Sequence, residues 1–130
     1  IFIDRKKITK IKETSKEIED YLESKGSICI FPEGTSTDGS RLLDFKSNLL
    51  QTAINKDIEI LPVAIQYLHD NKFCSAPAYY NDLSLFDSII NLIKLDNIVA
   101  KLTILPEIKS SFDRKVLANK AYAKINKVIN

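Results

Sequence analysis

Apolar and polar positions follow one another in blocks along this chain, and each block has the length and spacing of one secondary-structure element. Four segments carry apolar side chains three or four positions apart, which is typical of helices with one buried face. They cover residues 8–25, 45–55, 83–95 and 111–129. Four shorter apolar segments predict buried strands. They cover residues 1–3, 27–31, 59–67 and 98–105.

Capping and breaking residues refine these boundaries. Thr14 and Glu17 have the spacing of a capping box, so the first helix begins either near residue 8 or at Thr14. Gly26 is a natural end for it. Pro62 predicts an edge or an entry position in its strand, because proline cannot donate to a ladder. Residues 69–82 form the least regular stretch.

The elements alternate as strand and helix from one end of the chain to the other. Such alternation predicts an α/β fold with a mainly parallel sheet flanked by helices. The 130 residues suffice for one hydrophobic core and are too few for two ordinary domains. No repeat or linker interrupts residues 1–130, so we expect a single domain or part of one.

Composition excludes several classes. The chain is 45% hydrophobic and 28% charged, which is typical of a folded protein rather than a disordered one. A net charge of +2 does not indicate nucleic-acid binding. Two cysteines, Cys29 and Cys74, make neither a disulfide framework nor a metal site, and we expect Cys29 to be packed within its strand. No apolar run approaches the roughly 20 residues of a membrane-spanning helix.

The strongest chemical signal lies where the strand 27–31 gives way to a polar loop. Ligands of α/β sheets bind beyond the carboxyl ends of strands. The loop opens with Phe31-Pro32-Glu33-Gly34-Thr35. In this motif the proline stiffens the strand exit, the glutamate offers a hydrogen-bond acceptor, the glycine allows backbone geometry that a Cβ would block, and the threonine offers a hydroxyl. The following helix would begin at Phe45-Lys46, and its free amide groups would favour an anion. An ordinary loop with a turn at Asp38-Gly39 would explain the same residues.

Two further segments, in order and at suitable spacing, support the chemical interpretation. They are Ile1-Phe2-Ile3-Asp4-Arg5 and Leu61-Pro62-Val63-Ala64-Ile65. Together with the loop, they resemble the second, third and fourth conserved blocks of the glycerolipid acyltransferases, the family of 1-acyl-sn-glycerol-3-phosphate acyltransferases. Phe45-Lys46-Ser47 is also similar to family sequences. The resemblance weakens after Tyr67 and implies the carboxyl-terminal part of an incomplete acyltransferase-type domain.

This resemblance implies acyl transfer from an acyl-CoA or an acyl-carrier protein to the free hydroxyl of lysophosphatidate, in phospholipid biosynthesis. Arg5 would bind the acceptor's phosphate, as a guanidinium does bidentately. Glu33 would hold the glycerol part or order the loop, and Gly34 and Thr35 would shape it. Pro62 and Val63 would line the acyl side. No metal and no cofactor other than the acyl donor as co-substrate is implied.

Two departures from the family limit what can be carried over. Many members follow the Thr of the third block with Arg and Ser, whereas Ser36-Thr37 stand here, so Arg41, Lys46 or backbone amides would contact the phosphate instead. The family's catalytic His and Asp, in an Asn-His-x4-Asp block, precede the second block. His69 has Cys74 five positions on and reads as a loop residue. We therefore assign no catalytic residue to this chain and expect it to be inactive alone.

Membrane contact stays open at two places. Residues 5–12 are rich in Lys and Arg, which is typical either of a solvated helix start or of a surface facing anions or a membrane. The apolar helix 83–95 would either be buried against the sheet or touch a membrane. The resemblance implies a place at the cytoplasmic face of a membrane, peripheral or anchored through an upstream part.

Two other functions compete with the enzyme. One is a non-catalytic module, or gene remnant, that binds phospholipids or other anions. The other is a generic α/β domain that handles phosphoryl groups. The sequence contains neither a P-loop nor a dinucleotide fingerprint, which counts against the latter.

Overall fold

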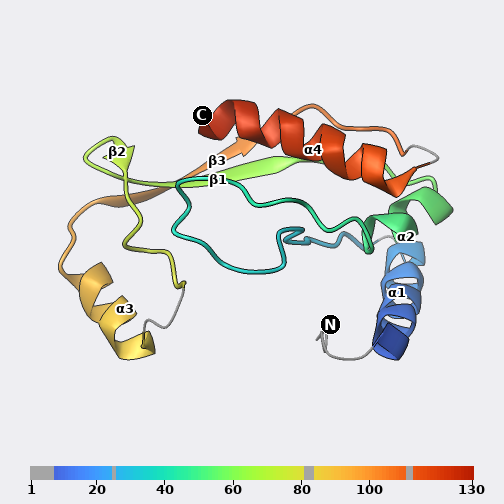
Figure 1. Ribbon diagram of the computed structural model, residues 1–130, viewed down its shortest axis with the longest axis horizontal. Helices are drawn as coiled ribbons and strands as arrows, with labels where there is room; N and C mark the ends of the chain where they lie inside the picture. Colours follow the sequence, from blue (N-terminus) through green and yellow to red (C-terminus); the bar gives the residue numbers. More distant parts are fainter. Residues whose placement is uncertain (1–7, 25, 81–83, 111–112) are drawn as a thin grey trace.

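The computed structural model describes residues 8–24, 26–80, 84–110 and 113–130, with side chains from Ser15 onward (Figure 1). Its elements are α1 (Ile8–Glu23), α2 (Leu50–Asn55), β1 (Val63–His69), β2 (Lys72–Phe73), α3 (Leu85–Ile93), β3 (Ile98–Ile104) and α4 (Arg114–Ile129). The expected helices and the two later expected strands are therefore present, with shifted ends. The expected strand 1–3 lies outside the described residues.

The sheet of the described residues has three strands in the order β2-β1-β3. Both pairings are antiparallel, and β1 lies against β3 from Val63↔Ile104 to His69↔Ile98. Asp70 and Asn71 join β1 to β2 with φ of 49° and 61°, the two positive values that a tight hairpin turn of the type I′ class requires. The prediction of a mainly parallel sheet is wrong for this part of the chain.

The position of α3 explains the antiparallel pairing. A parallel pair needs a crossover that returns the chain to the starting end of the sheet, usually through a helix packed on one face. Figure 1 shows α3 beyond the end of the sheet, away from α4. The chain therefore leaves β1 and enters β3 at the same end, and Asn97, with φ of 58°, turns it into β3. Periodicity identified the helix but not where it would pack.

The stretch 27–31 was expected to be a buried strand, and this prediction is wrong. No strand is formed there, and the side chain of Phe31 is 73% exposed. Cys29 is exposed rather than packed. Ile30 is the residue of this stretch that packs against the core. An apolar run becomes a buried strand only when a neighbouring strand pairs with it, and none of the described strands does so.

The core is built around α4. Asp113 caps this helix by accepting hydrogen bonds from the amides of Lys115 and Val116. One face of α4 then buries residues at helical spacing against α2 and the segment after β3. The buried cluster consists of Leu50, Ile108, Leu117, Ala118 and Ala121. Leu117 is completely buried, and α4 also packs against β1.

α1 begins at Ile8, which selects the earlier of the two predicted starts. Among its side chains from Ser15 onward, Ile18 is buried, and polar contacts attach the helix to the end of α2. Lys56 forms an ion pair with Glu23, and this partner lowers the pKa of the Glu23 carboxyl below its usual value. Asn55 Nδ2 donates to Glu19 Oε1 at 3.3 Å. None of the helices in the described ranges is long and apolar enough to cross a bilayer.

The two faces of the sheet differ. Ala64 is 1% exposed, whereas its neighbours Val63 and Ile65 on the opposite face are exposed. In β3, the partners of these two residues are Ile104 and Leu102, which are exposed as well. Because side chains alternate between faces, these four apolar residues share one face of the β1–β3 ladder. Within the described residues, α4 covers one face of the sheet and the other is left uncovered.

Candidate functional site

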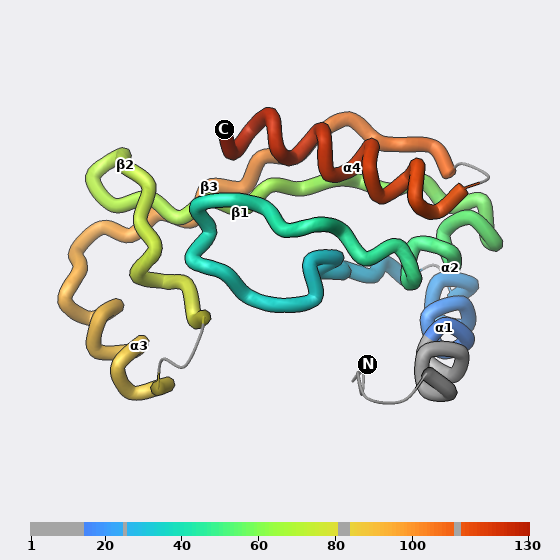
Figure 2. Tube along the Cα trace, in the orientation of Figure 1, coloured from blue at the N-terminus to red at the C-terminus, as the bar shows by residue number. Residues whose placement is uncertain are grey.

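Residues 32–46 form a loop whose two ends are joined by the backbone. The Lys46 amide donates to the Pro32 carbonyl at 2.8 Å, and the Gly34 amide donates to the Phe31 carbonyl at 3.1 Å. Figure 2 shows this segment leaving the body of the protein and returning beside β1. The motif residues Glu33 and Gly34 thus lie at the base of a closed loop rather than in an extended linker.

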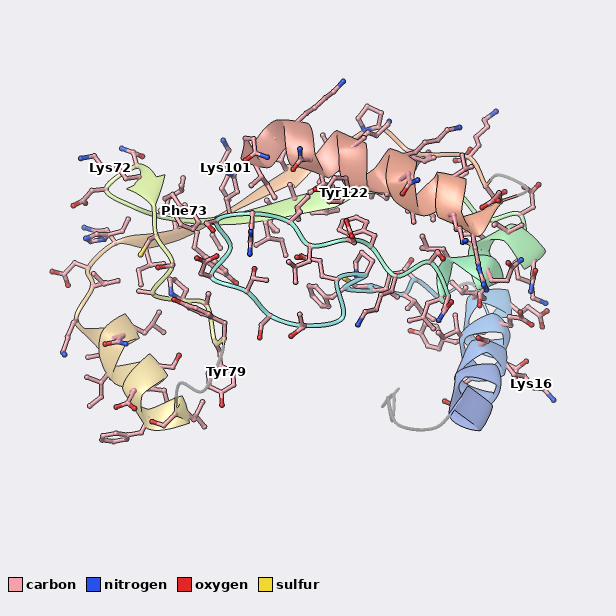
Figure 3. The ribbon with its side chains drawn as sticks, in the orientation of Figure 1. Lys16, Lys72, Phe73, Tyr79, Lys101 and Tyr122 are labelled. Atoms are coloured by element: carbon pink, nitrogen blue, oxygen red, sulfur yellow. The ribbon has the colours of Figure 1, made fainter. Side chains whose placement is uncertain are left out.

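An aromatic contact anchors the returning end of the loop. Phe45 packs against the core, and its ring meets that of Tyr122 edge to face, with centroids 5.5 Å apart. Figure 3 shows Tyr122 extending from α4 toward this segment. Lys46 is the next residue along the chain. The helix predicted for 45–55 begins at Leu50 instead, so Lys46 does not lie at a helix N-terminus, and the anion site expected from free helix amides is wrong.

Glu33 closes the loop from within. Its Oε2 accepts a hydrogen bond from the Leu43 amide at 2.8 Å across ten residues of chain. This part-buried hydrogen bond links Glu33 to the segment by which the loop returns to the core. Of the two roles that the resemblance implied for Glu33, the geometry favours ordering the loop. Sequence reasoning missed the partner, because a backbone amide carries no side-chain signal.

The tip of the loop is a local turn of side-chain hydrogen bonds. Asp38 Oδ1 accepts from the Ser40 amide at 2.9 Å and from the Ser40 hydroxyl at 2.8 Å. These bonds lower the pKa of the Asp38 carboxyl below its usual value. Gly39 has a φ of +79° and lies close to the Phe73 ring of β2. The turn predicted at Asp38-Gly39 is confirmed, and it places the tip beside the hairpin.

Gly34 and Lys46 meet at the base of the loop. Gly34 has a φ of +70°, which favours glycine. A Cβ added there would lie 2.9 Å from Lys46 Nζ and 3.2 Å from Lys46 Cδ. The lysine side chain therefore passes directly over the glycine. Lys46 is exposed and forms no ion pair with a carboxylate of the described residues, so its ammonium group is available to an anion.

The remaining predicted site residues do not all gather at this loop. Thr35 and Arg41 are exposed on it. Pro62 is buried just before β1, and its carbonyl accepts from the Leu105 amide at 3.0 Å, which confirms the predicted strand entry. Val63 points to the uncovered face of the sheet. Arg5, the predicted phosphate ligand, lies outside the described residues.

The single histidine occupies the end of a strand rather than a loop. His69 is the last residue of β1 and pairs with Lys72 of β2. Its Nε2 lies 3.6 Å from Asp70 Oδ2, and its buried Nδ1 has no hydrogen-bond partner among the described residues. No group of three or more His, Cys, Asp or Glu side chains suited to a metal ion occurs in the described part of the chain.

Replacing Gly34 by Ala should displace the lysine. The alanine would have to adopt a positive φ, which is unfavourable for any residue with a Cβ. Its Cβ would also press on the Lys46 side chain, whose flexible end would move away. We expect a loss of stability of about 1–2 kcal/mol and weaker binding of a phosphate-bearing ligand, measured by urea unfolding and calorimetry. Gly39→Ala is the matched control, because it has a similar φ but its Cβ would meet only Phe73 at 3.6 Å. Equal ligand binding in both variants would contradict the role given to the Gly34–Lys46 contact.

Comparison with known proteins gives this geometry its context. Residues 1–66 of the 130 match the family described as Acyltransferase. The chain belongs to this acyltransferase family, as the resemblance predicted. The match includes the loop and the first residues of β1.

Individual relatives point the same way. The chain is 25% identical to the 1-acyl-sn-glycerol-3-phosphate acyltransferase of Neisseria gonorrhoeae, over 99% of this chain and 51% of that protein. It is 28% identical to the lyso-ornithine lipid O-acyltransferase of Pseudomonas aeruginosa, over 82% of this chain and 42% of that protein. A shorter match, 37% identical over 54% of this chain and 30% of that protein, is to the 1-acyl-sn-glycerol-3-phosphate acyltransferase of Haemophilus influenzae. No solved structure matches this chain.

The chain corresponds to a part of each of these relatives. It spans about half the length of the N. gonorrhoeae protein and a smaller share of the P. aeruginosa one. The family model establishes the family of this chain. The activity and substrates of the whole protein remain a proposal, because the chain covers only part of each relative.

Proposed function

We propose that this chain forms the acceptor side of an acyltransferase that moves an acyl group from acyl-CoA or acyl-carrier protein to the free hydroxyl of lysophosphatidate. The reaction forms an ester C–O bond, breaks the thioester C–S bond, and leaves the hydroxyl proton on the released thiol. The observation that carries the proposal is the Lys46 ammonium, which has no carboxylate partner among the described residues and is held over Gly34 in a loop that Glu33 closes. Membership of the acyltransferase family supports it.

Each residue of the loop base would then have a physical task. Lys46 would attract the acceptor's phosphate, since an ammonium is a compact partner for phosphate oxygens. Gly34 lets the lysine lie close to the backbone, where a side chain would obstruct it. Glu33 would keep the loop closed through Leu43. Arg5 stays the second phosphate ligand that the resemblance implies, and Pro62 and Val63 the expected lining of the acyl side.

The general base of this reaction is not assigned to any residue of this chain. His69 has Cys74 rather than Asp five positions on. In the family pattern the base and its orienting carboxylate belong to a block that precedes the second block, and positioning the acceptor hydroxyl beside such a base would be this chain's contribution.

The decisive experiment measures acyl transfer by the protein as its own gene encodes it. Lysophosphatidate is supplied with acyl-CoA or acyl-carrier protein, and phosphatidate is the expected product. Lys46→Ala should raise the KM for lysophosphatidate by roughly tenfold while changing kcat little, because a phosphate contact of about 1.4 kcal/mol is lost in ground state and transition state alike. Lys115→Ala, which removes an exposed lysine at the start of α4, is the control.

A second candidate function is a non-catalytic module that binds phospholipid anions. The absence of a His-x4-Asp pair in residues 1–130 favours it for this chain taken alone. Binding of lysophosphatidate without any phosphatidate formation, with either donor, would support the module and end the enzymatic proposal.

A further inference from the structure

Helix α3 exposes its apolar side. Its exposed large apolar side chains lie at positions 85, 86, 89, 92 and 93, which fall on one side of a helix, and Ile90 beside them is half-buried. No residue of α3 is buried, and the exposed fractions of Phe86 and Ile93 are 70% and 76%. Of the two possibilities left open by the sequence, burial against the sheet is therefore wrong for the described structure. Figure 1 shows α3 apart from α4 and the β1–β3 ladder.

Part of the polar side of the same helix borders a pocket. Ser88 and Asn91 of α3, and Lys94 just after it, line this pocket, which has a volume of about 410 Å³. Ser75 and Tyr80, from the segment that leads into α3, form the other side of this pocket. A helix of a water-soluble domain normally turns its apolar side inward. Here the apolar side is exposed instead, so this surface calls for an apolar environment outside the described residues.

The size of this surface argues against a protein partner on α3 alone. Nine residues make a helix about 14 Å long. One side of such a helix offers far less than the roughly 800 Å² per partner that a stable dimer buries. Insertion into the edge of a lipid layer has no such requirement, because lipid chains adapt to any apolar shape and the binding strength scales with the apolar area buried.

The chemistry around the helix is that of an interfacial segment. Phe86 lies at its start, and Figure 3 shows Tyr79 on the neighbouring segment; aromatic rings of this kind are enriched at membrane–water boundaries. The charged side chains on and just after the helix are Asp87, Lys94 and Asp96, which carry no excess of positive charge. Attachment would thus depend on apolar insertion rather than on attraction to anionic headgroups.

We propose that α3 docks the protein on a lipid surface by inserting the apolar side formed by Leu85, Phe86, Ile89, Leu92 and Ile93. The inference rests on the proposed function, whose acceptor is a lipid. It adds the element that would hold the protein at the layer from which that acceptor comes.

A single tryptophan provides a direct test, since the chain contains none. Phe86→Trp is made in the protein as its gene encodes it, over a background in which any other tryptophan is replaced by Phe. On vesicles of phosphatidylcholine and phosphatidylglycerol, its emission should shift to the blue and be quenched by brominated lipid chains. Emission that is already blue-shifted without vesicles and unchanged on their addition would show that protein covers α3, and would overturn the proposal.

Vesicle binding of paired variants gives the second measurement. Burying one large apolar side chain contributes roughly tenfold to partition, so Phe86→Ser/Ile93→Ser should lower it about 100-fold. Leu102→Ser/Ile104→Ser, on the uncovered sheet face and 63% and 68% exposed, is the matched control. Docking by α3 would be contradicted if both pairs lost vesicle binding equally, or if the α3 pair lost none. It would also be contradicted if 0.5 M salt, on the order of several times physiological ionic strength, abolished binding.

An assay in detergent separates this inference from the proposed function. With lysophosphatidate dispersed in mixed micelles, the α3 variants should transfer acyl groups at wild-type rates while failing to bind vesicles. If the unaltered protein transfers no acyl group but binds vesicles through α3, the proposed function fails and the docking surface stands. If it transfers acyl groups but α3 variants bind vesicles normally, the docking surface fails alone.

Discussion

Replacing Glu33 by Ala should lower kcat/KM for acyl transfer to lysophosphatidate by roughly 10- to 100-fold. The carboxylate of Glu33 accepts a hydrogen bond from the Leu43 amide at 2.8 Å, and this bond links the two sides of the loop near its base. A hydrogen bond to a charged group contributes about 1.5–3 kcal/mol, and losing it would free the loop that positions Lys46. The effect should appear in steady-state kinetics of the protein as its gene encodes it.

Two further variants test whether the hydrogen bond between Glu33 and the Leu43 amide is what matters. Glu33→Gln keeps an acceptor oxygen and should retain most of the activity that Glu33→Ala loses. Asp44→Ala removes an exposed carboxylate from the same loop and should change kcat/KM by less than about twofold. A Glu33→Ala enzyme with unaltered kinetics would show that the loop needs no closure for the reaction.

Replacing Leu117 by Ala should lower the free energy of unfolding by about 2–5 kcal/mol. Leu117 is fully buried in the cluster that joins α4 to α2 and to Ile108. Removing its branched end would leave a cavity in the region that also supports Phe45, and through it the returning end of the loop. Urea unfolding followed by circular dichroism measures the change.

The neighbouring residue supplies the control. Val116 lies on the same helix but is 44% exposed, so Val116→Ala should cost about 0.5 kcal/mol or less. If both substitutions destabilise the protein equally, α4 would not be the centre of the core.

Periodicity predicted the helices of this chain well, because helix formation follows local spacing and capping. Asp113 and the apolar positions of α4 are examples, and the first helix begins near residue 8 as one of the two predictions had it. The helix expected from residue 45 begins only at Leu50. There, the Lys46 amide bonds to the Pro32 carbonyl, a contact made across 14 positions that local spacing does not report.

The sequence by itself determined the family, the motif residues of the loop and the turn at Asp38-Gly39, since these depend on residue identity and short spacing. The tertiary structure alone decided strand direction, the exposure of Phe31 and Cys29, and the outward apolar side of α3. It also decided that Glu33 closes the loop through a backbone amide and that Lys46 lies over Gly34. The physical reason is the same in each case. The apolar pattern of a segment indicates which of its side chains favour burial. Which surface buries them depends on how segments distant in the sequence pack together.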